Sequence, residues 1–161
     1  MRSLSAIETV CVIAVAGSVL AATVPAFVRN LRASRLSEPV EALNKLALHA
    51  TLYAVGRPTQ LAYPPSAPLT PAKVPAGQRV VDPPGTWDHP TWRVLDFRML
   101  EPHGFAYEFQ SNGAKNGASF VARGHGDLDG DGVTSTFELD GESRDSDEPK
   151  VGELRVYREV E

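Results

Sequence analysis

The hydrophobic positions near the start of the chain form one uninterrupted run. Residues 9–28 (TVCVIAVAGSVLAATVPAFV) contain no charged side chain, and Glu8 and Arg29 bound the run. An α-helix of this length rises roughly 30 Å, which matches the hydrocarbon core of a bilayer. The pattern therefore predicts a membrane-spanning helix or the apolar part of a signal peptide.

Beyond this run the apolar positions recur every three or four residues, which is the period of an amphipathic helix. They are Leu36, Val40, Leu43, Ala47, Ala50 and Ala54. Gly56 and Pro58 then supply a helix stop. One helix is predicted from about residue 5 to 55, with bends at Pro25 and Pro39. Its first half is apolar all round, and its second half has one face for a folded domain.

The rest of the chain has the pattern of a loop followed by strands. Residues 57–90 hold nine of the thirteen prolines, which predicts a long surface loop without strand pairing. Short runs of alternating apolar and polar residues follow, at 92–97, 105–110, 119–123, 134–139 and 153–159. The predicted fold class is α+β: a long N-terminal helix packed on a small antiparallel sheet of about four strands.

Charge and cysteine content restrict the possible functions. The chain has 161 residues, about the size of one ordinary domain, and 42% apolar residues, so one globular unit is expected; its net charge is -4. Between Asp127 and Glu148 there are nine acidic residues against the single Arg144. This balance argues against nucleic acid as a partner and indicates a segment that attracts cations. Cys11 is the only cysteine, so no intramolecular disulfide can form.

The apolar run carries three residues in a shared frame. If Leu4 is the first mature residue, Glu8 is the fifth, Gly17 the fourteenth and Pro25 the twenty-second. With a proline-rich loop and a meander after the helix, the chain resembles the type IV pilin and type II secretion pseudopilin superfamily. The resemblance covers about the first thirty residues strongly and the remainder only by architecture.

The resemblance implies a processing site and partners. A prepilin peptidase would cut between Ser3 and Leu4, and the new amino terminus would be methylated. The family usually has glycine before the cut, where this chain has Ser3. The implied partners are other pilin or pseudopilin subunits, the assembly platform and the bacterial inner membrane. The helix would cross this membrane once, with the sheet domain outside the cytoplasm. The assembled subunit would lie in an extracellular or periplasmic filament.

Glu8 has a functional and a simpler interpretation. A carboxylate among packed apolar helices must be paired or neutralised. In the family its partner is the free amino terminus of a neighbouring subunit, and this pairing would set the axial register between subunits. Alternatively, Glu8 simply marks the cytoplasmic end of a membrane helix. Gly17 and Pro25 are also common in membrane helices, and only the shared frame gives them significance.

An aspartate-rich segment resembles a calcium-binding loop. Asp127, Asp129, Asp131 and Gly132 fit D-x-D-x-D-G, with Val133 at the backbone-carbonyl position, and Glu138 completes the pattern. In an EF-hand the last ligand lies on a helix, whereas residues 134–139 have a strand pattern that places Phe137 inward and Glu138 outward, so Glu138 is the weaker ligand. The alternative is a plain hairpin turn. Because three close aspartates repel one another, we predict that calcium binds there.

Catalytic patterns are lacking in the sequence, and no enzyme is expected. His49, His89, His103 and His125 have no metal-binding spacing, and no G-x-S-x-G motif occurs. Trp87 and Trp92 are expected to pack under the long loop. The leading hypothesis is a filament subunit; the alternative is a secreted calcium-dependent binding domain whose signal peptide is cleaved before Phe27.

The predicted organisation has five segments in order. They are a short leader (1–3), a membrane and assembly helix (4–28), an amphipathic half-helix (29–56), a proline-rich loop (57–90) and an antiparallel sheet domain (91–161) that contains the aspartate-rich loop 127–138.

Overall fold

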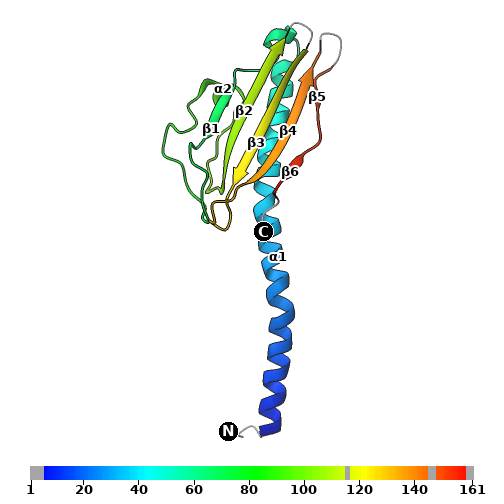
Figure 1. Ribbon diagram of the computed structural model, residues 1–161, viewed down its shortest axis with the longest axis vertical. Coiled ribbons are helices and arrows are strands. Elements are labelled where there is room, and N and C mark those ends of the chain that lie inside the picture. The colour runs from blue at the N-terminus through cyan, green and yellow to red at the C-terminus, as the bar shows by residue number, and fades with distance from the viewer. Residues whose placement is uncertain (1–5, 115–116, 145–147, 159–161) are drawn as a thin grey trace. The chain divides into compact units, whose positions relative to one another are not determined.

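The computed structural model describes residues 6–114, 117–144 and 148–158, and their elements are drawn in Figure 1. The order is α1 (Ala6–Ala54), η1 (Thr59–Leu61), β1 (Ala67–Thr70), α2 (Pro90–Val94), β2 (Phe105–Ala114), β3 (Gly117–Gly126), β4 (Ser135–Ser143), β5 (Lys150–Val151) and β6 (Arg155–Tyr157). The chain divides into two compact units, Met1–Ser37 and Glu38–Glu161, which we call the helix unit and the sheet unit.

The helix unit consists of the first part of α1 and has an apolar surface. Its exposed large side chains are Ile7, Val10, Val12, Ile13, Val15, Val19 and Val24. The hydroxyls of Ser18 and Thr23 donate to the helix carbonyls of Ala14 and Val19, both at 2.8 Å. These two polar side chains are thus satisfied within the helix and leave its apolar character unchanged.

Among the described residues, no helix combines the length and the apolar character needed to cross a membrane. This finding contradicts the predicted membrane half of the helix and the predicted single-pass location in the inner membrane.

The sheet unit contains six strands, so the prediction of about four was wrong. The strand order is β1-β2-β3-β4-β5, every pairing is antiparallel, and β6 also pairs with β4. The prediction missed β1 because its segment is rich in proline. Proline is tolerated at Pro68 because β1 lies at the edge of the sheet, where one side of the backbone needs no partner.

Residues 92–97, expected as a strand, instead lie in and after the short helix α2. Pro90 occupies the first turn, where its missing N–H costs nothing. The N-cap is His89, whose ring Nδ1 accepts a hydrogen bond from the backbone N–H of Thr91 at 3.3 Å. Helix-start chemistry therefore outweighs the strand-like alternation of this segment.

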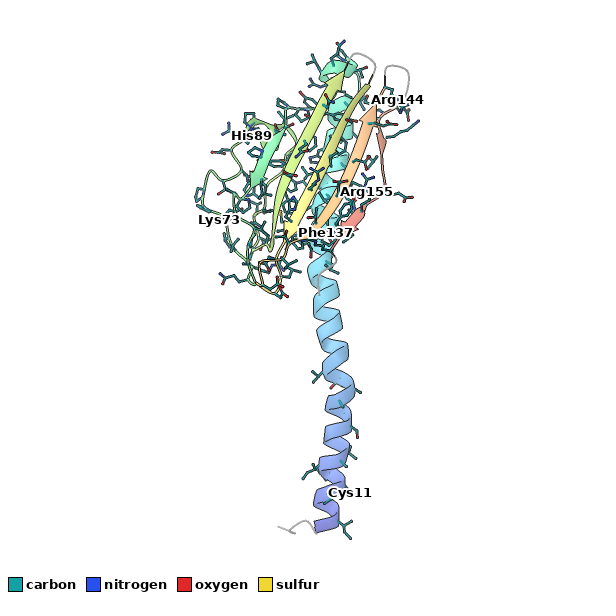
Figure 2. All side chains as sticks on the ribbon, in the orientation of Figure 1. Cys11, Lys73, His89, Phe137, Arg144 and Arg155 are labelled. Carbon is teal, nitrogen blue, oxygen red and sulfur yellow. The ribbon has the colours of Figure 1, made fainter. Side chains whose placement is uncertain are left out.

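The core of the sheet unit lies between α1 and one face of the sheet (Figure 1). Residues 43–54 of α1 contribute Leu43, Leu46, Ala47, Ala50 and Ala54, and the strands contribute Phe105, Tyr107, Phe109, Phe120 and Phe137. Every second residue of β4 is buried, as period-two strands require. Figure 2 shows Phe137 on β4 and Arg155 on the neighbouring β6. The predicted inward position of Phe137 is confirmed.

Candidate functional site

The aspartate-rich loop joins two central strands of the sheet. It follows β3 directly, and β4 begins at Ser135. Asp127 is buried, whereas Asp129 and Asp131 are exposed. The backbone of Asp127 is anchored to the proline-rich segment, because Gly77 donates its N–H to the Asp127 carbonyl at 2.8 Å. A strand-loop-strand arrangement thus replaces the helix-loop-helix of an EF-hand.

Hydrogen bonds from the loop's own backbone hold the three carboxylates. Asp127 accepts from Gly130 at 2.8 Å and from Gly132 at 3.1 Å, one bond to each oxygen. Asp129 accepts from the N–H of Asp131 at 3.2 Å, and Asp131 from that of Val133 at 2.6 Å. The φ angles of Gly130 and Gly132 are 81° and 88°, a region that favours glycine. The sequence therefore folds locally into a tight series of turns.

The loop brings together oxygen ligands suited to a hard cation. One carboxylate oxygen from each of Asp127, Asp129 and Asp131 lies within 4.8 Å of the others. Each oxygen that accepts one hydrogen bond retains a second lone pair for a metal. This donor set fits calcium, which takes carboxylate oxygens in flexible geometry. Val133 contributes its N–H to the turns, and its carbonyl remains a predicted ligand.

Glu138 is not brought into this group. Its carboxylate lies on the outer face of β4 and pairs with Arg123 of β3 at 2.6 Å and with Arg155 of β6 at 3.2 Å. Arg123 also pairs with Glu108 of β2 at 2.9 Å. Since these four residues are cross-strand neighbours in register, they form a row of alternating charge across the sheet. The outward direction of Glu138 was predicted correctly, and its role here is in this row.

The predicted assembly and processing residues are placed only in part. Ser3 and Leu4 lie outside the described residues. Glu8 and Pro25 lie in α1, and only the backbone of these two residues is described. Gly17 is exposed, and a Cβ added to it would have no atom of the described residues within 4 Å. Among the described residues, no contact therefore requires glycine at this position.

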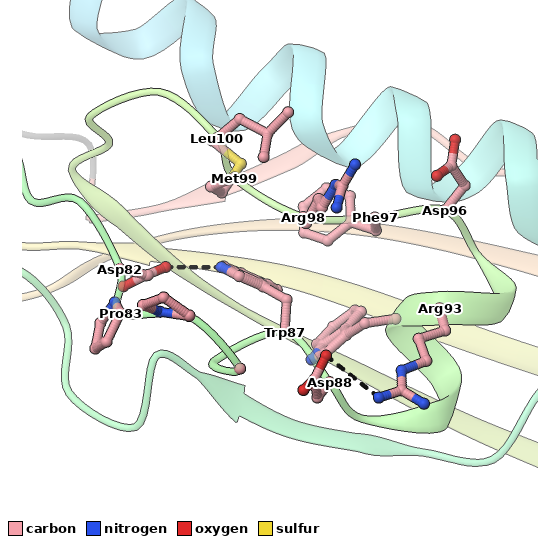
Figure 3. A pocket seen from close by; sticks show the side chains of 13 residues that line it. Asp82, Pro83, Trp87, Asp88, Arg93, Asp96, Phe97, Arg98, Met99 and Leu100 are labelled. Atoms are coloured by element: carbon pink, nitrogen blue, oxygen red, sulfur yellow. Dashed lines mark hydrogen bonds and ion pairs between the residues drawn. The ribbon is translucent and has the colours of Figure 1, made fainter.

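Sequence reasoning missed a polar cluster under the proline-rich segment. His103 is fully buried; its Nε2 lies 2.8 Å from Oδ2 of Asp82, and its Nδ1 lies 2.7 Å from the carbonyl oxygen of Phe105. The indole N–H of Trp87 donates to the same Oδ2 at 2.7 Å (Figure 3). No sequence signal joins these residues, because 21 positions separate Asp82 from His103.

A second part of this cluster lies on α1. Glu38 accepts a hydrogen bond from the backbone N–H of Gly104 at 3.0 Å and pairs with Arg79 at 2.7 Å. Burial raises the pKa of Glu38 above its ordinary value, and the Gly104 hydrogen bond and Arg79 lower it by less. The cluster thus attaches α1 to the loop that precedes β2.

Comparisons with protein-family models, curated proteins and solved structures found no match to this chain.

Proposed function

We propose that the chain is a structural subunit, a pilin, minor pilin or pseudopilin, of a type IV pilus or type II secretion filament, and that it assembles with other subunits through its N-terminal helix. The observation that carries the proposal is the exposed apolar surface of α1 between Ile7 and Val24. Uncovered apolar surface of this extent is unfavourable in water and marks an interaction site.

The same helix also supports the proposal through its second part. Residues 38–54 of α1 bury one side in the core of the sheet unit. A single helix therefore combines an apolar end without partners among the described residues and an end fixed to a folded domain. This division suits a subunit whose helices associate while its sheet unit forms the surface.

The pilin resemblance adds a role for Glu8. Packed between apolar helices, its carboxylate would require a positive partner, which the amino terminus of a neighbouring subunit would supply. Incorporation should then depend on Glu8 far more than on an exposed glutamate of the sheet unit. Glu41, exposed on α1, is the matched control.

Filament incorporation tests the proposal directly. An epitope-tagged full-length chain is expressed in its native host, filaments are sheared off, and the tagged fraction in them is measured with the N-terminal sequence of the recovered chain. Wild type and Glu41→Ala should be incorporated, Glu8→Ala should fall by about tenfold or more, and the chain should begin at Leu4. A chain that begins at Phe27 and never enters filaments would refute the proposal and support the secreted calcium-dependent binding domain.

For the sheet unit we propose a calcium ion held by Asp127, Asp129 and Asp131. The close carboxylates and the two glycines of the loop support this assignment. When bound, the ion would supply the positive charge that three neighbouring carboxylates lack. Its effect would be to stiffen the β3–β4 connection and, through Gly77, the proline-rich segment attached to it.

A further inference from the structure

A cavity of about 470 Å³ lies between the segment 82–88 and the segment that follows α2. Figure 3 shows Trp87 in its middle, Asp82 on one side, the Asp88–Arg93 pair on another, and Phe97 with Arg98 opposite. This volume is within the range of small-molecule sites. Neither filament assembly nor the calcium loop uses these residues.

The floor of the cavity is held in place before any ligand arrives. The side chain of Asp82 is 6% exposed, and its Oδ2 accepts from Trp87 and lies beside His103. Trp87 in turn packs edge-to-face on Phe97 at 5.4 Å between ring centroids. The other oxygen of Asp82, Oδ1, makes no hydrogen bond to any described residue. Asp82 therefore presents a fixed acceptor beside a fixed aromatic ring.

The rim carries charged groups that the fold leaves unused. Within the described part of the chain, the side chains of Asp96 and Arg98 have neither a hydrogen bond nor an ion pair, although both line the cavity. Asp96 has a φ of 45°, a left-handed conformation that is uncommon for a residue other than glycine. Such backbone positions occur often at binding sites. Arg93, by contrast, is paired with Asp88 at 3.3 Å.

We propose that this cavity binds a neutral saccharide of about two sugar units. Sugar hydroxyls both donate and accept hydrogen bonds, which matches the carboxylates of Asp82 and Asp96 and the guanidinium of Arg98. The apolar C–H face of a sugar ring suits an aromatic and aliphatic wall such as Trp87 and Met99. Three carboxylates against two guanidiniums in the lining disfavour a phosphorylated ligand.

The indole N–H signals of the full-length protein provide the test. The chain has two tryptophans; Trp87 donates to Asp82, whereas Trp92 is buried and donates to Thr70 at 2.9 Å. The ¹⁵N-labelled protein, kept in solution in a detergent without sugar groups, is titrated with cellobiose, maltose, lactose and diacetylchitobiose. At least one disaccharide should shift the Trp87 signal saturably at millimolar concentration, and the Trp92 signal by less.

Variants then assign the binding to the cavity. Arg98→Ala and Asp96→Asn should each weaken the titration by about fivefold or more, because each removes a hydrogen bond to a charged group. Arg144→Ala, which removes an exposed arginine outside the cavity, should leave it unchanged. No saturable shift with any of the four sugars, or wild-type affinity in both cavity variants, would overturn the proposal. A shift caused by decaproline and by none of the sugars would also overturn it, in favour of a peptide groove. None of these results depends on filament incorporation.

Discussion

Arg123 donates a hydrogen bond from Nε to the carboxylate of Glu138 at 2.6 Å, directly across β3 and β4. Both side chains are largely covered, with 25% and 14% of their surfaces exposed. Because Arg123 also binds Glu108, one guanidinium connects three strands on the outer face of the sheet. This pairing explains why Glu138, the last residue of the calcium-loop sequence pattern, does not join the three aspartates.

Loss of this guanidinium should destabilise the sheet unit. Arg123→Met keeps most of the aliphatic stem and leaves the carboxylates of Glu108 and Glu138 without their shared partner, and we expect a loss of about 1–3 kcal/mol in the free energy of unfolding. Arg144→Met is the control, because its pair with Glu142 is exposed and should contribute less than about 1 kcal/mol. Urea unfolding of the full-length protein measures both. Equal effects would contradict the structural role of the row.

Calcium should raise the melting temperature of the sheet unit through the three aspartates and without Glu138. Asp129→Asn should abolish this rise, since it removes one of the three close carboxylates. Glu138→Gln should retain the rise, although it lowers the starting stability, because its carboxylate belongs to the row with Arg123. Differential scanning calorimetry with millimolar calcium or chelator compares the three proteins. A rise that disappears in Glu138→Gln would restore Glu138 as a ligand.

The aspartate-rich loop and its neighbouring strands show which features of the fold were predictable from the sequence. Periodicity located β2, β3 and β4 and the inward position of Phe137, because alternation directly reports which face is buried. The spacing of Asp127, Asp129 and Asp131 indicated their proximity, because all three lie in one short loop. The partner of Glu138 was not predictable, because Arg123 becomes its neighbour only through strand register. Asp82 and His103 are also far apart in the sequence and become neighbours only through the folding of the chain.

Stability should depend on the ionisation of Glu38. Burial raises its pKa above 4.5 in the folded protein, so the folded state binds a proton more tightly than the unfolded state. The stabilisation from this proton is complete below the unfolded pKa and is lost as the pH rises through the folded pKa. Urea unfolding between pH 4 and 7 measures this effect. The free energy of unfolding of wild type minus that of Glu38→Gln should fall as the pH rises across that window.

The exposed Glu41→Gln, three positions along α1, controls for loss of a carboxylate as such. The difference in the free energy of unfolding between Glu41→Gln and wild type should vary much less over the same range of pH. If the free energy of unfolding of wild type minus that of Glu38→Gln stayed constant or rose with pH, the pKa of Glu38 would not be raised by folding.

The close approach of β3 to the aromatic core predicts that a larger residue at position 126 destabilises the sheet unit. A Cβ at this position would lie 2.5 Å from Cε1 and 2.8 Å from Cδ1 of the fully buried Phe105 ring. Gly126→Ala must therefore displace a core ring, at a cost of about 1–3 kcal/mol. For Gly117, at the other end of β3, the Ser143 carbonyl oxygen is the only atom of the described residues within 4 Å of the Cβ position, at 3.9 Å. In urea unfolding, Gly117→Ala should remain close to wild type while Gly126→Ala unfolds at a lower concentration, and equal midpoints for the two variants would show that the Phe105 ring does not limit this position.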